Sequence, residues 1–207
     1  MRREEPLRLG VLISGSGTNL QAIIDASERG ELDARVVVVI SNRENARGLD
    51  RARAHGIDAV HVDRTRYETN RDYNHAIRIE LEKREVELVV MAGYMRLLGS
   101  EVLDAFEQRV VNIHPALLPS FAGASGIRDA WEHGVKVTGV TVHYANEVFD
   151  EGPIIAQEAV AVDEDDTLES LEAKIHEVEH RLYVRSIQWI AEGRVRVDGR
   201  RVRIARP

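Results

Sequence analysis

Short apolar runs alternate with longer stretches of helical spacing along the first half of the chain. Runs of β-branched and other apolar residues predict strands, and apolar residues repeated every three to four positions predict helices. The expected strands are 7–13, 35–40, 59–62, 88–92 and a short one at 110–114, and the expected helices are 20–28, 45–55, 71–84 and 101–106. This rhythm predicts an α/β fold with a mostly parallel, doubly wound sheet and helices on both faces.

The pattern changes after the proline-rich stretch that ends at Pro119. Two segments rich in β-branched residues, 137–144 and 154–162, follow one another with no helix between them, so an antiparallel pair is expected. The stretch 166–169 resembles a capping box and predicts a long helix that ends near residue 191. The segment 194–204 predicts a hairpin. One domain over residues 1–207 is the simplest account.

The stretch Asn112-Ile113-His114-Pro115 is the first candidate for chemistry. Side chains alternate along a strand, so Asn112 and His114 share a face. Pro115 cannot continue a central strand, which places the pair at a strand's carboxyl end, where open α/β sheets bind ligands. Asn offers a donor to an oxyanion and His a proton shuttle near neutral pH. The alternative is that Asn112 caps a turn and His114 is a packed histidine.

A glycine-rich turn, 14–19, separates the first strand from the first helix. Gly15 and Gly17 allow a sharp bend, and the helix that follows presents unpaired N–H groups to an anion. Leu20 stands where a dinucleotide fingerprint needs its third glycine, and no lysine follows as in a Walker loop. The turn therefore favours a single phosphate. The alternative is an ordinary turn capped by Thr18 or Asn19.

Two further segments have no decided role from spacing alone. Asp150 precedes a Gly152-Pro153 turn, and one interpretation is that it serves only to form that turn. If the fold brings it to His114, its carboxylate instead raises the pKa of the histidine. The stretch 94–98 either lines an apolar slot with one arginine or belongs to the core.

Composition narrows the class of protein. The chain has 207 residues, 43% of them hydrophobic and 30% charged, which is typical of a globular domain. The net charge of −7 argues against a nucleic-acid surface. The chain has no cysteine, which excludes disulfides and cysteine metal sites and fits a reducing cytoplasm. No apolar run approaches the ~18 residues of a membrane span, and the charged start is a poor secretory signal.

Four motifs occur in the order of one known family. They are Ser14-Gly15-Ser16-Gly17-Thr18-Asn19-Leu20-Gln21-Ala22-Ile23, Met95-Arg96-Leu97-Leu98, Asn112-Ile113-His114-Pro115-Ala116-Leu117-Leu118-Pro119 and Asp150-Glu151-Gly152-Pro153. From about residue 7 to 201 the chain resembles the phosphoribosylglycinamide formyltransferases, the folate-dependent transformylases of purine biosynthesis. The resemblance implies a seven-stranded, mostly parallel, Rossmann-like sheet. It also implies formyl transfer from 10-formyltetrahydrofolate to the amine of glycinamide ribonucleotide, with no metal.

The resemblance also implies a role for each matching residue. Asn112, His114 and Asp150 match the catalytic trio, and Glu179 matches the glutamate that receives the glycinamide amine. Gly17, Thr18 and Asn19 match the loop that holds the substrate phosphate. The formyl-folate site matches Arg71, Met95, Arg96, Leu97, Leu98, Asn146, Glu147, Val148 and Phe149. The phosphate-binding part then spans about 7–100, the catalytic and folate part about 88–192, and the hairpin about 193–204. A cytoplasmic monomer or homodimer without nucleic-acid or membrane partners is expected.

The chain departs from the family pattern at three places. The loop 121–128 lacks the family's histidines, His176 stands where relatives have Gln, and Val184 replaces a Pro. We expect that loop to be a mobile lid in which Ile127 is exposed. The alternative is that Ile127 is buried and structural.

Three other classes share some of these features. Methionyl-tRNA formyltransferase adds a C-terminal nucleic-acid-binding domain, which this acidic chain is too short to hold. Formyltetrahydrofolate hydrolase begins with an extra domain, whereas the expected fold starts within ten residues of Met1. A non-catalytic phosphate-binding module is the third alternative.

Overall fold

A single nine-stranded sheet runs through the molecule in the order β3-β2-β1-β4-β5-β6-β7-β9-β8. The computed structural model describes residues 5–206. The strands are β1 (Leu7–Ile13), β2 (Ala34–Ser41), β3 (Asp58–His61), β4 (Leu88–Met91), β5 (Val110–His114), β6 (Val137–Tyr144), β7 (Ile154–Ala161), β8 (Val195–Asp198) and β9 (Arg201–Ile204). The helices are α1 (Thr18–Glu28), α2 (Arg47–Ala54), α3 (Asn70–Glu82), α4 (Ser100–Leu103), α5 (Gly126–His133) and α6 (Leu168–Ala191), with a 3-10 turn at Arg64–Arg66. The prediction of one α/β domain with a mostly parallel sheet is confirmed.

The expected count of seven strands is wrong. The C-terminal hairpin, β8 and β9, joins the sheet through the pairing of Ile154 with Arg201 and adds two strands beyond β7. Val195, Val197, Val202 and Ile204 alternate along the hairpin and pack against the main core, which gives it an apolar face to bury. Strands β3, β2, β1, β4 and β5 are parallel, whereas β6 runs antiparallel to both β5 and β7.

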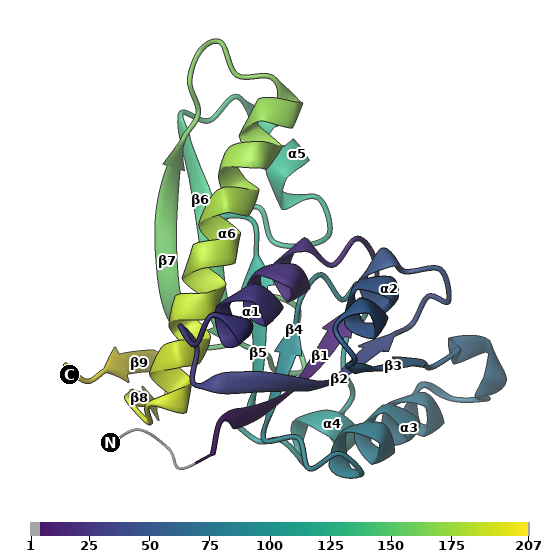
Figure 1. Cartoon of the computed structure of the whole chain (residues 1–207). Coiled ribbons are helices and arrows are strands. Elements are labelled where there is room, and N and C mark those ends of the chain that lie inside the picture. The colour runs from purple at the N-terminus through teal and green to yellow at the C-terminus, as the bar shows by residue number, and fades with distance from the viewer. Residues whose placement is uncertain (1–4, 207) are drawn as a thin grey trace.

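Helices cover both faces of the sheet, as Figure 1 shows. Apolar residues of α1, α2 and α6 form one core cluster with the alternate strand positions Val11, Val39, Val90 and Val111. Residues of α3 and α4 form a second cluster with the intervening positions, among them Leu12 and Val89. This alternation explains why the parallel strands are apolar throughout, since both of their faces are covered. None of the helices described has the length and apolarity that crossing a bilayer requires.

Helix boundaries differ from the predicted ones where side chains cap or pack. Helix α1 begins at Thr18 rather than Leu20, because Gly17 takes a left-handed conformation (φ 70°) and starts the helix. The capping box of α6 uses Thr167 and Ser170, one residue later than expected, and each hydroxyl accepts the other residue's backbone N–H. The predicted helix 101–106 is the shorter α4.

Helix α5 was not predicted, and it changes the expectation for Ile127. The segment 126–133 is helical, and Ile127 is partly buried against the main core. Ile127 and the fully buried Ala130 are three residues apart and lie on one face of this short helix. The expectation that Ile127 is exposed is therefore wrong, whereas the mobility of the loop before it stays a prediction.

Helix α6 is attached to the sheet through a buried tyrosine. The hydroxyl of Tyr183 lies 3.0 Å from the carbonyl oxygens of both Met91 and Val111, and its single hydrogen is shared between them. Met91 ends β4 and Val111 lies in β5, directly before Asn112. The long helix thus has a fixed position over the carboxyl ends of the strands that reach the candidate site.

Candidate active site

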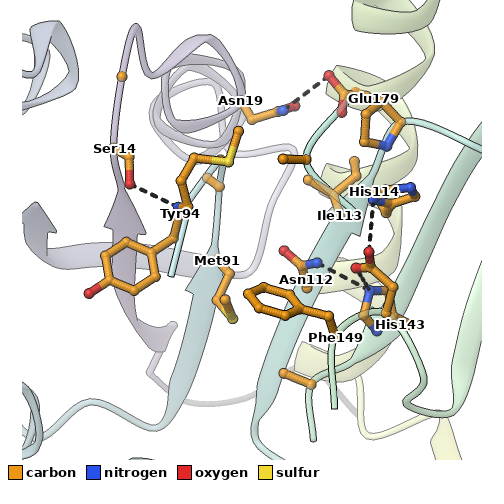
Figure 2. A pocket seen from close by; sticks show the side chains of 18 of the residues that line it. Ser14, Asn19, Met91, Tyr94, Asn112, Ile113, His114, His143, Phe149 and Glu179 are labelled. Carbon is orange, nitrogen blue, oxygen red and sulfur yellow. Dashed lines mark hydrogen bonds and ion pairs between the residues drawn. The ribbon is translucent and has the colours of Figure 1, made fainter. Parts of the chain in front are cut away.

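Strand pairing places a second histidine beside the Asn-x-His pair. Asn112 and His114 point from the same face of β5, and the antiparallel register sets His143 opposite Asn112 and Thr141 opposite His114. The Nδ2 atom of Asn112 lies 3.1 Å from Nε2 of His143, as Figure 2 shows. The Nδ1–H of His143 donates to the Tyr144 carbonyl at 2.9 Å, and its Nε2 faces both the Asn112 amide and the carboxylate of Asp150.

Asp150 lies between the two histidines. Its Oδ2 is 3.4 Å from Nδ1 of His114, and its Oδ1 is 3.6 Å from Nε2 of His143. The backbone N–H of Gly123 donates to Oδ2 at 2.8 Å. Burial raises the pKa of Asp150, but His143, the Gly123 amide and the nearby charge of His114 outweigh it, so the pKa is lowered overall. The expected approach of Asp150 to His114 therefore occurs, and this carboxyl is ionised at neutral pH.

The ring of His114 is held from both sides. Its Nε2–H donates to the carbonyl of Phe121 at 2.8 Å, while Nδ1 faces the carboxylate of Asp150. Both neighbours are hydrogen-bond acceptors, so each ring nitrogen faces one of them. Gly126, the first residue of α5, packs against the ring: a Cβ added there would lie 3.1 Å from Nε2. A Cβ at position 126 would therefore be in tight contact with the ring and with the Phe121 carbonyl, and would fit only if these groups moved slightly.

These groups open onto one cavity of about 570 Å³. Of the predicted site residues, the cavity is lined by Gly17, Thr18, Asn19, Met95, Leu97, Leu98, Asn112, His114, Asn146, Val148, Phe149, Asp150 and Glu179. One wall is apolar, because Met95, Leu97, Val148 and Phe149 expose about half of their surface there. Both interpretations of the stretch 94–98 are therefore partly right. Tyr94 and Leu98 are buried, whereas Met95 and Leu97 are exposed.

Three predicted site residues lie outside the cavity lining. The side chain of Arg71 is 84% exposed, with its Nε 3.7 Å from Glu101. The guanidinium of Arg96 stacks over the ring of Tyr73 at 5.4 Å. Glu147 is exposed in the loop that leads to Asp150. Sequence spacing gave no information on how these side chains point.

The opposite end of the cavity holds the glycine-rich turn. Within residues 5–206, no protein group accepts from the backbone N–H groups of Ser16, Gly17 or Thr18. These orphan donors at the start of α1 are the usual features of an anion site. Arg43 also lines this end of the cavity.

Glu179 of α6 lies beside the turn. Its side chain is buried, and burial raises its pKa to about 7, although a hydrogen bond from Asn19 acts in the opposite direction. That bond joins Asn19 Nδ2 to Glu179 Oε2 at 3.3 Å, and Oδ1 of Asn19 is buried without a partner among the described residues. Both residues line the cavity, and the Glu179 carboxyl is the acceptor there.

Sequence reasoning missed His143. Thr141 and His143 alternate on an otherwise apolar strand, and this polar face was the available signal. The pairing of β5 with β6 was not predicted, so nothing linked that face to Asn112. Among residues 5–206 there is no group of three or more His, Asp or Glu side chains that could hold a metal ion.

One cavity thus joins a turn with free amides, a buried carboxyl, an amide beside two histidines and an apolar wall. Such a cavity is typical of an enzyme that moves a small group between two substrates held side by side, one anionic and one largely apolar.

The chain belongs to the formyl transferase family, whose model matches residues 7–187. It is 41% identical to the phosphoribosylglycinamide formyltransferase of Bacillus subtilis over 176 residues, which cover 85% of this chain and 90% of that one. Glycinamide ribonucleotide transformylase 1 from Symbiobacterium toebii has a similar crystal structure, with a TM-score of 0.95, 51% identity, and coverage of 98% of this chain and 95% of that one.

A formyltetrahydrofolate deformylase from Pseudomonas syringae is also similar in structure. Its TM-score is 0.89 at 28% identity, and the match covers 97% of this chain and 66% of that chain. The fold is therefore shared by relatives named for transfer and for hydrolysis.

Proposed function

We propose that the protein transfers the formyl group of 10-formyltetrahydrofolate to the amine of glycinamide ribonucleotide, a step of purine biosynthesis. The observation that carries the proposal is the single cavity that joins the Gly17 turn and Glu179 to Asn112, His114 and Asp150. The names of the relatives support the same pair of substrates.

Asn112 and His114 would stabilise the oxyanion that forms when the amine attacks the formyl carbon. The Asn112 amide carries two N–H groups, and the contact with His143 uses one and leaves the other for the formyl oxygen. His114 donates its Nε2–H to the Phe121 carbonyl. It can donate to the formyl oxygen only when that oxygen takes the place of the Phe121 carbonyl. Phe121 has a left-handed backbone (φ 54°), which a bulky residue adopts at a cost, and this favours the exchange.

Asp150 would support proton transfer through His114. The lowered pKa of Asp150 keeps a negative charge 3.4 Å from Nδ1 of His114, where it orients the ring. One group of the pair would take up the proton that the attacking amine loses, while the other gives a proton to the leaving nitrogen of the folate.

Glu179 and the turn 17–19 would hold the acceptor substrate. The free N–H groups of Gly17 and Thr18 suit the phosphate, and the Glu179 carboxyl suits the amine N–H groups.

The apolar wall would hold the pterin ring of the formyl donor. It comprises Met95, Leu97, Leu98, Val148 and Phe149, with Asn146 at its edge. Arg71, Arg96 and Glu147 lie outside the cavity lining, and the two guanidinium groups would suit the carboxylates of folate.

The net charge of −7 argues against polyanionic partners, and the absence of cysteine fits a reducing cytoplasm. We therefore place the enzyme in the cytoplasm, as a monomer or homodimer without nucleic-acid or membrane partners.

The experiment that tests the proposal gives the purified protein 10-formyltetrahydrofolate, with and without glycinamide ribonucleotide. We expect formylated amide when the acceptor is present and little formate when it is absent. Rapid formate release without the acceptor, and no formylated amide with it, would favour the deformylase, the candidate that the Pseudomonas syringae structure supports.

A further inference from the structure

The glycine-rich turn is held from behind by helix α2. The N–H of Gly48 donates to the Gly15 carbonyl at 3.1 Å, and Nε of Arg51 donates to the Ser16 carbonyl at 2.9 Å. The next carbonyl, that of Gly17, accepts from Gln21 N at 3.0 Å within α1. Three consecutive carbonyl groups therefore have fixed partners.

These partners set the direction of the amides that face the anion site. The C=O and N–H of a trans peptide unit point in opposite directions. The unit that joins Gly15 to Ser16 is held by Gly48, and the unit that joins Ser16 to Gly17 is held by Arg51. Fixing the Ser16 carbonyl toward Arg51 therefore directs the Gly17 N–H away from α2.

Helix α2 approaches the turn as closely as backbone allows. A Cβ on Gly17 would lie 2.8 Å from the Cα of Gly48, and a Cβ on Gly48 would collide with the side chain of Ile13. Glycine is thus needed at both positions where the turn and the helix meet. The next contact from α2 to the turn is made by the side chain of Arg51, which binds the Ser16 carbonyl.

Arg51 is itself held by α1. Its Nη1 donates to Oε1 of Gln21 at 3.1 Å, and Gln21 in turn donates to Asp25 at 2.7 Å. Within residues 5–206 the Arg51 guanidinium forms no ion pair with a carboxylate. Its neighbour on the same helix, Arg53, is an exposed arginine paired with Asp50 at 2.8 Å. Arg51 therefore differs from a surface arginine in that its partners are the turn and the helix that the turn begins.

We propose that Arg51 is a positioning residue for the phosphate subsite, an inference that rests on the proposed function. It holds the peptide between Ser16 and Gly17 so that the Gly17 N–H faces the substrate phosphate. Arg51 sets the affinity for the phosphate without touching it.

The test compares Arg51→Met with the matched control Arg53→Met, which removes the same charge from the same helix. We expect the KM for glycinamide ribonucleotide to rise about tenfold in R51M, the size expected when one charge-assisted hydrogen bond is lost. The kcat at saturation and the KM for the formyl folate should stay the same, and R53M should match the wild type. With glycinamide ribonucleoside, which lacks the phosphate, R51M and wild type should have equal kcat/KM.

Binding of ribose 5-phosphate by calorimetry separates this inference from the proposed function. A wild type that binds ribose 5-phosphate but formylates no amine would refute the proposed function, while a weaker affinity in R51M would still support the positioning role. Equal affinity in R51M and wild type, or equal losses with the phosphorylated and dephosphorylated substrates, would overturn it. If R51M does not fold, R51K, which keeps the charge but loses the Nε–H, should show a loss in the same direction.

Discussion

Replacing Glu179 by glutamine should stabilise the protein above neutral pH and change its stability little near pH 4. Burial raises the pKa of Glu179 from 4.5 to about 7. The folded state then binds the proton more tightly than the unfolded state. Between these two pKa values a rise in pH therefore favours unfolding, and the cost is complete above pH 7. At 1.36 kcal/mol per pKa unit, the shift corresponds to a penalty of about 3 kcal/mol.

Glutamine suits this position because it matches the neutral form of the glutamate. Its Oε1 can still accept from Asn19 Nδ2, and its N–H group can donate to the Asn19 Oδ1, which has no partner among residues 5–206. The removed cost is therefore that of burying a negative charge, rather than that of a lost contact.

The assay is urea unfolding of wild type, Glu179→Gln and the control Glu177→Gln at several pH values from about 4 to 9. Glu177 is exposed on the same helix, so its variant should follow the wild type. The difference between Glu179→Gln and wild type should grow from near zero at pH 4 to about 3 kcal/mol above pH 7. Parallel curves for the two proteins, or a variant that is less stable at high pH, would refute the reasoning.

Three further predictions concern the other end of the cavity. Asn112→Ala and His114→Ala should each lower kcat by ~10²–10³, the usual cost of one oxyanion donor; near-normal turnover in a folded variant would remove that residue from the mechanism. Asp150→Asn should nearly abolish turnover but keep ribonucleotide affinity by calorimetry, and a parallel loss of affinity would make Asp150 a binding residue. Gly126→Ala adds a Cβ 3.1 Å from His114 Nε2 and should lower kcat several-fold. Its Tm should not fall, because alanine favours a helix by up to ~1 kcal/mol relative to glycine; an unchanged kcat would show that the ring has room to move.

Local patterns predicted most elements of the fold. Parallel strands that are buried on both faces, such as 35–40 and 88–92, are continuous apolar runs that can be recognised in the sequence. The hairpin's place in the sheet was not predictable from its own residues, since the pairing of Ile154 with Arg201 depends on where β7 begins. Helix α5 was missed because Ile127 and Ala130 make up too short an apolar stripe.

For the candidate site, alternation along β5 was enough to place Asn112 and His114 on one face. Asp150 was predicted to act on His114 only if the fold brings the two residues together. Whether it does depends on how the chain crosses from residue 115 to 136. The same crossing decides that β6 runs antiparallel beside β5 and brings His143 to Asn112. Glu179 came only from the family resemblance, because a carboxyl in a long helix has no sequence signal of its own burial.

The shared hydroxyl of Tyr183 has a consequence for how the two substrates meet. Tyr183 and Glu179 are four residues apart on one face of α6, so the bond that ties Tyr183 to the end of β4 and to Val111 of β5 also fixes Glu179 relative to Asn112. Asp150 and Phe121 come instead from loops. The cavity thus has a stationary wall and an adjustable one. We expect amide hydrogens of the stationary wall to exchange mainly through global unfolding and those of 121–125 and 145–153 through local opening, so bound substrates should slow exchange mainly in these loops.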